Sequence, residues 1–173
     1  MNRAILRIIP NLFSFISVFV AGVTAATVPH WWSVIFLVFS LYLGGNGGRL
    51  ANRQNRTSRM SLAVGAVSDR ISEIFWAIAF YRIGAPLAWV LAFAALAAFQ
   101  EYAKVRLASA MMQHVAFNTV AERPTRAGFL FIAILTYQIT VSHAWMMALA
   151  AGLTLLQAVS FLLLLRFAYK QLH

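Results

Sequence analysis

The chain has 173 residues, of which 62% are hydrophobic and 10% are charged, and its mean hydropathy is +0.77. So little polar side chain cannot cover a soluble globule of this size, and the composition therefore indicates an integral membrane protein. The absence of cysteine excludes disulfide bonds, thiolate metal sites and cysteine nucleophiles.

The apolar runs predict six helices, since crossing a bilayer of about 30 Å takes roughly 20 residues. In chain order they span residues 10–28, 31–48, 60–81, 85–106, 126–142 and 144–166. The sequence shows no internal repeat and no linker. We therefore expect one all-α transmembrane domain over residues 1–173.

The first residues, MNRAILRII, place Arg3 and Arg7 one helical turn apart with apolar residues on the other face. This pattern predicts a short helix lying in the membrane interface ahead of the first span. A cleaved signal peptide is the alternative, but the apolar run after Pro10 is longer than a typical signal core and ends in TVPHWW. We therefore expect a retained first helix.

Lys and Arg lie mostly at the two ends of the chain and in the second and fourth connections. Because short loops rich in these residues stay in the cytoplasm, we expect both termini on the cytoplasmic side of a bacterial inner membrane. An aromatic belt is expected at the opposite interface, made of Trp31, Trp32, Tyr81, Trp89 and Trp145. The net charge of +10 is then explained by the orientation of the chain in the membrane and by attraction to anionic lipid headgroups. Nucleic acid is therefore not an expected partner.

All four acidic residues lie toward the predicted cytoplasmic half, and Asp69 and Glu73 are one turn apart on the third segment. Ionisable groups at membrane depth are costly unless they face a bundle interior or a wet cavity. This predicts a polar chamber open to the cytoplasm. Two readings of Asp69 and Glu73 remain open: a structural ion-pair network with Arg70 or Arg49, or remaining work as a ligand or base.

Residues 44–69 read GGNGGRLANRQNRTSRMSLAVGAVSD. Their spacing resembles the motif D-x2-D-G-x2-A-R-x8-G-x3-D-x3-D of the CDP-alcohol phosphotransferase family, membrane enzymes that move a phosphatidyl group from a CDP-lipid to an alcohol. The motif's first glycine, its alanine and its last aspartate fall on Gly48, Ala51 and Asp69. The stretches IIPNLFSFISVFVAG, SDRISE, QEYAKVRLAS and TVAERPTR are similar to actinobacterial phosphatidylglycerophosphate and phosphatidylinositol phosphate synthases, and they extend the resemblance over most of the chain.

The motif is degenerate at five positions. Gly44, Gly47 and Gly65 stand where the family has aspartates, Asn52 replaces the arginine and Ser61 replaces the second glycine. In the family the aspartates hold two divalent metals, Mg²⁺ or Mn²⁺, against the CDP diphosphate, and the last one deprotonates the acceptor alcohol. Glycine supplies no side-chain oxygen for such a site, so the resemblance implies a lost metal pair.

The remaining acids have reduced roles in this interpretation. Asp69 would be a residual base, and Asp69 with Glu73 would hold one cation weakly, if any. The resemblance also implies that Gly48 and Ala51 lie against the nucleotide. The alternative is a seam of small residues, in which Gly44 and Gly48 form a GxxxG pair that lets two helices approach closely.

The resemblance further implies a cytoplasmic pocket for a phosphorylated acceptor, formed by Arg106, Glu122, Arg123 and Arg126. Guanidinium groups suit phosphate oxygens because they donate two parallel hydrogen bonds. The alternatives are a purely topological role for these cations and an ion pair of Arg123 with Glu122 or Glu101.

Three functions follow from these expectations. The first is a non-catalytic or heteromeric partner in phospholipid metabolism that binds CDP-linked or anionic lipid, and a homodimer is also expected by analogy to the family. The second is an active transferase that joins a phosphatidyl group from CDP-diacylglycerol to a polyol phosphate and releases CMP. The third is a purely structural membrane subunit.

Overall fold

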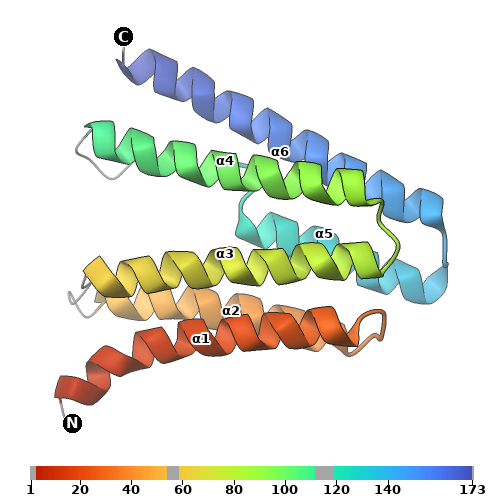
Figure 1. The fold of residues 1–173 in the computed structure, drawn as a ribbon, viewed down its shortest axis with the longest axis horizontal. Helices are drawn as coiled ribbons and strands as arrows, with labels where there is room; N and C mark the ends of the chain where they lie inside the picture. The colour runs from red at the N-terminus through yellow and green to blue at the C-terminus, as the bar shows by residue number, and fades with distance from the viewer. Residues whose placement is uncertain (1–2, 54–58, 112–118, 173) are drawn as a thin grey trace.

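The computed structural model describes residues 3–53, 59–111 and 119–172, and within them the side chains of 11–46, 63–110 and 119–171. These ranges form six helices and no strand, so the predicted all-α class is confirmed (Figure 1). The helices are α1 (Arg3–Thr27), α2 (Ser33–Arg53), α3 (Arg59–Arg82), α4 (Leu87–Met111), α5 (Arg123–Ile139) and α6 (His143–Leu172).

The amino-terminal helix differs from the expectation. α1 is one continuous helix that passes through Pro10, so no separate interfacial helix precedes it. A proline inside a helix removes one backbone hydrogen bond and favours a bend, and Figure 1 shows α1 bending near its amino-terminal end.

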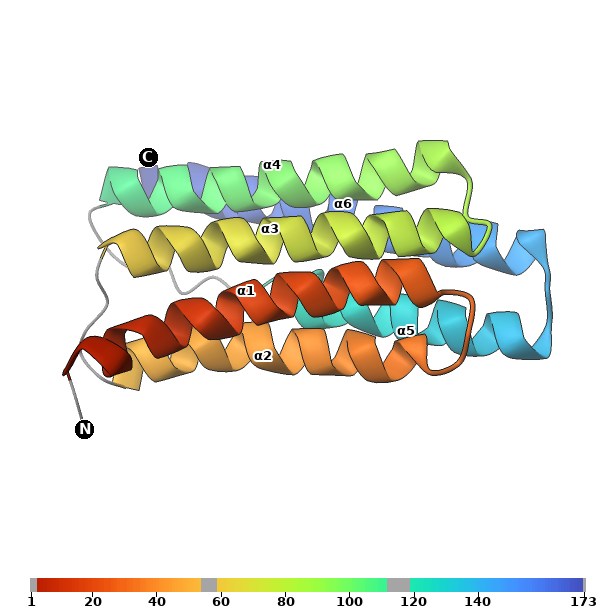
Figure 2. The same ribbon diagram turned by 60° about the horizontal axis from the view of Figure 1, so that its bottom comes forward.

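Five of the helices pack as two groups, and the short α5 joins these groups. α1 lies against both α2 and α3, and α4 lies against α6 (Figures 1 and 2). Small buried side chains such as Ala21 and Ala79 allow close helix contact. Ser40 also donates a 2.9 Å hydrogen bond to the carbonyl oxygen of Ser17, which ties α2 to α1.

The bundle has one basic end and one aromatic end. Both termini lie at the same end (Figures 1 and 2), as an even number of helices requires. The turns after α1, α3 and α5 lie at the other end, and the predicted aromatic residues are close to these turns. Which compartment faces each end stays a prediction.

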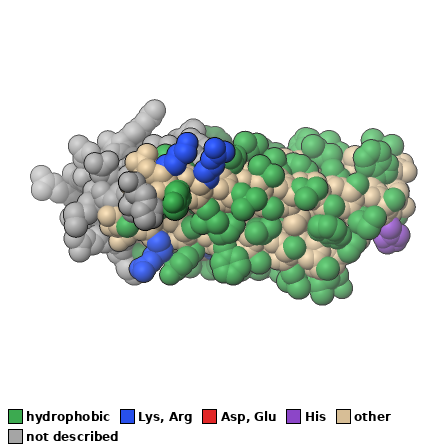
Figure 3. All heavy atoms as spheres, turned by 90° about the horizontal axis from the view of Figure 1, so that it is seen from above, with side chains coloured by type: hydrophobic (Ala, Val, Ile, Leu, Met, Phe, Trp, Pro, Cys, Tyr) green, Lys and Arg blue, Asp and Glu red, His purple; other side chains and the backbone are tan. Residues whose placement is uncertain are grey.

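The surface is unusually apolar. Large hydrophobic side chains point outward on several helices, and Phe19 is 72% exposed and Leu155 64% exposed. Figure 3 shows hydrophobic side chains along the length of the bundle and Lys and Arg toward one end. Among the described helices, His143–Gln171 alone is long and apolar enough to be identified as a membrane span by length and composition. Crossing by all six helices therefore stays a prediction.

The turn between α3 and α4 depends on Gly84. This residue has φ +97°, a left-handed conformation that glycine adopts without steric cost. The N–H groups of Gly84 and Ala85 donate to the carbonyl oxygens of Tyr81 and Phe80, at 3.0 and 3.1 Å. These two bonds are the Schellman motif that ends a helix, and they let α4 turn back beside α3.

Candidate functional site: a charged cluster between α3, α4 and α5

Eight charged side chains, some buried and some about one third exposed, meet between α3, α4 and α5, and we call them the charged cluster. Its members are Asp69, Arg70, Glu73, Glu101, Lys104, Glu122, Arg123 and Arg126. The cluster contains all four acidic residues of the chain and four bases, so its formal charge is zero. Balanced pairing of this kind is what makes ionisable groups tolerable inside an apolar bundle.

Helical spacing on α3 and α5 produces two parallel ion pairs. Asp69 and Glu73 are four residues apart on α3, and Arg123 and Arg126 are three residues apart in the first turn of α5, so each pair shares one helix face. Arg123 pairs with Asp69. Arg126 Nη2 lies 2.7 Å from Glu73 Oε1. α5 is thereby held to α3 by two charge-assisted contacts, which are stronger than neutral hydrogen bonds.

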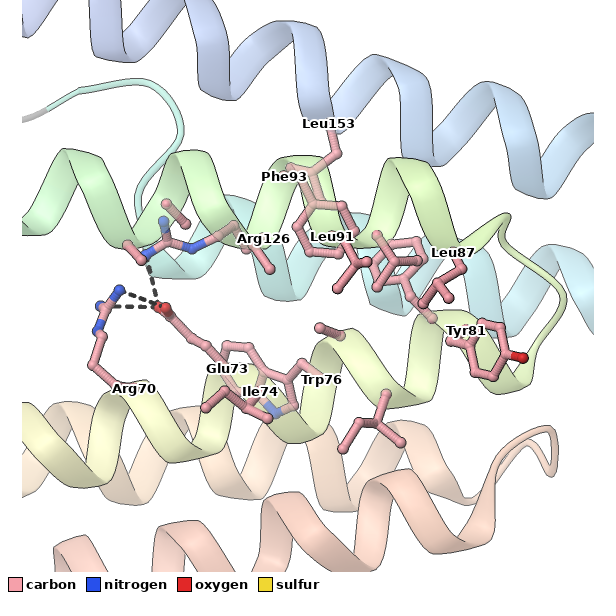
Figure 4. Close-up of a pocket in the computed structure, with 17 residues that line it drawn as sticks. Arg70, Glu73, Ile74, Trp76, Tyr81, Leu87, Leu91, Phe93, Arg126 and Leu153 are labelled. Carbon is pink, nitrogen blue, oxygen red and sulfur yellow. Dashed lines mark hydrogen bonds and ion pairs between the residues drawn. The ribbon is translucent and has the colours of Figure 1, made fainter.

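Glu73 is held from both sides. Arg70 Nη1 lies 2.7 Å from Glu73 Oε2, and Arg126 lies at the other oxygen (Figure 4). Arg70 is one of the two partners that the sequence offered for the α3 acids, and the side chain of the other, Arg49, lies outside the described residues. The Glu101 carboxylate lies further out, 3.9 Å from Arg126 and 4.0 Å from Arg70. The Arg126 side chain is only 5% exposed, so this pair belongs to the interior of the bundle.

The Arg123 guanidinium lies among α2, α3 and α5. It pairs with Asp69 rather than with Glu122 or Glu101, the alternatives considered from the sequence. Its Cζ also lies 5.2 Å from the centre of the Trp76 ring, within cation–π range. A Cβ on Gly44 would lie 2.8 Å from Nη2 and closer still to Nη1. The guanidinium thus lies directly against the α2 backbone.

Glu122 precedes α5 and ties this helix to α4. Its carboxylate accepts hydrogen bonds from the Lys104 ammonium, from the Thr119 backbone N–H at 2.9 Å and from the Thr119 hydroxyl at 3.0 Å. Burial of the carboxyl raises its pKa, but these hydrogen bonds outweigh burial and leave the pKa of Glu122 below its ordinary value.

Two buried glutamines extend the cluster into the contact between α4 and α6. Gln157 donates to Gln100, and Gln100 donates to the Thr119 hydroxyl. Arg126 Nη1 lies 3.5 Å from Gln157 Oε1, a long contact. These glutamines were not among the predicted site residues, although an amide side chain in an apolar helix requires a partner and so signals a polar contact.

An apolar groove of about 420 Å³ runs between α3 and α4. Arg70, Glu73 and Arg126 lie at one end of the groove, and Tyr81 and Leu87 lie at the other (Figure 4). Most of its lining is aliphatic or aromatic. The expected polar chamber is thus replaced, in the described residues, by paired charges beside an apolar groove.

The remaining predicted site residues are scattered. Gly47, Gly48 and Ala51 lie outside the described side chains. A Cβ on Gly65 would meet nothing within 4 Å, so Gly65 faces open space. Arg106 is exposed and lines a shallow pocket with residues of α4 and α6. The structure therefore brings Asp69, Glu73, Glu122, Arg123 and Arg126 into one cluster and places Arg106 on the surface.

The predicted seam of small residues takes another form at Gly44. The close neighbour of Gly44 is the Arg123 side chain rather than the backbone of a second helix. The absence of a side chain at this position therefore makes room for a guanidinium.

The carboxylates do not fit a pair of divalent ions. Mg²⁺ and Mn²⁺ prefer several oxygen ligands around one point, whereas Asp69 and Glu73 face separate arginines and Glu122 faces Lys104. Among the described side chains, no three acidic or histidine residues are placed so that they could hold one metal ion. A metal ion would have to displace a guanidinium to reach Glu73, and at Asp69 it would have to bind beside the guanidinium that engages Oδ1.

Comparison with known proteins adds one finding. A family model described as CDP-alcohol phosphatidyltransferase matches residues 7–156, from α1 into α6. No curated protein and no solved structure matches the chain.

Proposed function

Because the chain belongs to the CDP-alcohol phosphatidyltransferase family, and is thus a membrane protein of phospholipid metabolism, we propose that it is a member without transferase activity that binds lipid and acts beside a partner chain. The observation that carries this proposal is the pairing of both α3 acids with arginines of α5.

The ion pairs oppose catalysis in two ways. A general base must reach the proton that it accepts, and the Asp69 carboxylate is already engaged by Arg123. Separating one partner from a buried ion pair is strongly unfavourable, because it leaves an uncompensated charge. Glu73 is more deeply buried and is held by two arginines.

Lipid binding is supported by the groove beside the cluster. Its apolar lining suits an acyl chain, and Arg70, which is partly exposed, lies at the charged end where a headgroup would sit. The basic end of the bundle would also attract anionic or CDP-linked lipid.

A partner chain is supported by the apolar outer faces of α1, α4 and α6, which carry many exposed large side chains. Such faces suit lipid or a second membrane protein. The partner is a related membrane protein or a second copy of this chain. A purely structural subunit would keep the partner and lack the lipid binding. The proposed location is a bacterial inner membrane with both termini in the cytoplasm.

The second candidate is an active transferase that releases CMP. One observation favours it: the Asp69 side chain is 35% exposed, so a substrate that displaced Arg123 could reach the carboxylate. This candidate requires movement of the first turn of α5.

The test is release of CMP from CDP-diacylglycerol by the purified chain with a panel of alcohol and polyol phosphate acceptors, in Mg²⁺ or Mn²⁺. We expect wild-type protein and the Asp69→Asn variant to release equal, background amounts, while an active synthase of the family assayed in parallel shows that the assay works. Release by the wild type that Asp69→Asn abolishes would contradict the proposal and establish the transferase.

A further inference from the structure

Position 44 lacks a side chain for a specific reason. A Cβ on Gly44 would lie 2.8 Å from Arg123 Nη2 and 3.0 Å from Cζ, whereas a Cβ on the adjacent Gly45 would meet nothing within 4 Å. A side chain at 44 would therefore force the guanidinium to move, and the movement would be unfavourable because the Arg123 side chain is only 12% exposed and is paired with Asp69. The constraint therefore applies to position 44 and not to its neighbour.

The same guanidinium pairs with a carboxylate of α3. Arg123 pairs with Asp69 and lies over the face of Trp76, both on α3. Its side chain is only 12% exposed. One cation that originates in α5 thus contacts the backbone of α2, a carboxylate of α3 and an aromatic ring of α3.

An arginine can hold such a place permanently. Its guanidinium stays charged at all accessible pH values and is more weakly hydrated than an ammonium, so it tolerates burial beside a carboxylate. A divalent ion in the same place would need several oxygen ligands, and Gly44 and Trp76 supply no side-chain oxygen.

We infer that the Arg123 guanidinium is a resident cation of this bundle: it occupies the space between Gly44 of α2 and Asp69 of α3 and joins α2, α3 and α5 without a divalent metal ion. The inference rests on the proposed function, because a site that contains its own cation needs no metal cofactor. It goes further by assigning a structural role to Arg123 and to the glycine at 44.

The first experiment is a double-mutant cycle on the full chain in detergent, followed by thermal unfolding. Gly44→Ala is expected to lower Tm by about 2–4 °C relative to Gly45→Ala, from overpacking. Gly45→Ala, the matched control, is expected to leave Tm unchanged or raise it, because alanine favours helix. In an Arg123→Ala background, Gly44→Ala should behave like Gly45→Ala. An equal fall in Tm in both backgrounds would overturn the inference.

If Arg123→Ala does not fold, the same comparison is made in an Arg123→Lys background. The compact ammonium leaves more room beside position 44, so Gly44→Ala should lower Tm less in this background than in the wild type. An undiminished fall would count against the inference.

The second experiment measures metal dependence directly. Wild-type Tm is expected to be the same in EDTA, Mg²⁺ and Mn²⁺, since the site has its cation. A saturable rise in Tm with either metal that Asp69→Asn abolishes would overturn the inference even if no CMP is released. Release of CMP by a protein whose Gly44 and Arg123 substitutions are coupled as expected, and whose Tm does not rise with either metal, would overturn the proposed function and leave this inference standing.

Discussion

Glu122 lies at the start of α5, and its carboxylate stabilises contacts outside that helix. It occupies the N-cap position of α5 but makes no capping hydrogen bond there. Its carboxylate instead accepts hydrogen bonds from Lys104 of α4 and from Thr119. One side chain thus sets how the first turn of α5, which carries Arg123 and Arg126, is positioned beside α4.

The lowered pKa of Glu122 predicts a pH-dependent stability. A carboxyl whose pKa is depressed by folding contributes its full stability above its ordinary pKa of 4.5, and that contribution is lost as the pH falls below this value. We expect Glu122→Gln to unfold at a lower temperature than the wild type near neutral pH, and the difference in Tm to shrink below about pH 4.5. A difference that does not change with pH would show that the charge of Glu122 contributes nothing.

The pair of α3 and α4 shows how small residues shape a groove. Ala94, Ala97 and Ala98 have the i, i+3, i+4 spacing that places them on one face of α4, and all three line the groove toward α3. Their small side chains leave space that the large residues Trp76 and Phe93 border without filling. The groove therefore results from residue size on one helix face.

Filling this groove tests lipid binding at the level of the two helices. Ala94→Trp would place a large ring in the groove, and we expect it to reduce the amount of phospholipid that copurifies with the protein. Ala95→Trp, one residue along and on the exposed side of α4, is the matched control and should retain the wild-type amount. Lipid extraction and mass spectrometry give the measurement. Equal lipid in both variants would exclude the groove as a binding site.

The whole molecule separates its charges. All four acids lie in the neutral charged cluster, so the entire net charge of +10 is carried by residues outside it. Most of these cations are near the end of the bundle that holds both termini. A neutral cluster within the bundle and an excess of cations toward one end are consistent with a bundle oriented across a membrane by its basic loops.

This arrangement predicts the topology. Because the chain has no cysteine, single cysteines can be labelled without background. We expect His30→Cys and Val141→Cys to react with a membrane-impermeant thiol reagent in intact spheroplasts, and Gln171→Cys to react only after the membrane is opened. Labelling of His30→Cys and Val141→Cys from opposite sides would contradict six crossings.

Much of the site could be anticipated from local sequence, but its pairing could not. The one-turn spacing of Asp69 and Glu73 and the Arg70 contact are properties of a single helix. The partner of Asp69 is 54 residues away on α5, and its identity depends on how α5 packs against α2 and α3. For the same reason the small residues at 44–48 suggested a helix seam, whereas Gly44 contacts a side chain from a third helix.

The amino-acid sequence by itself determined the helical class, the six helices and the placement of both termini at one end of the bundle. These features follow from hydropathy and from basic loops, which are properties of short stretches of chain. It also carried the family resemblance that the family match confirmed. Only the tertiary structure decided that two arginines of α5, Arg123 and Arg126, face the acids of α3. That outcome depends on long-range packing, because a buried charge must find an opposite charge wherever the fold brings one within reach.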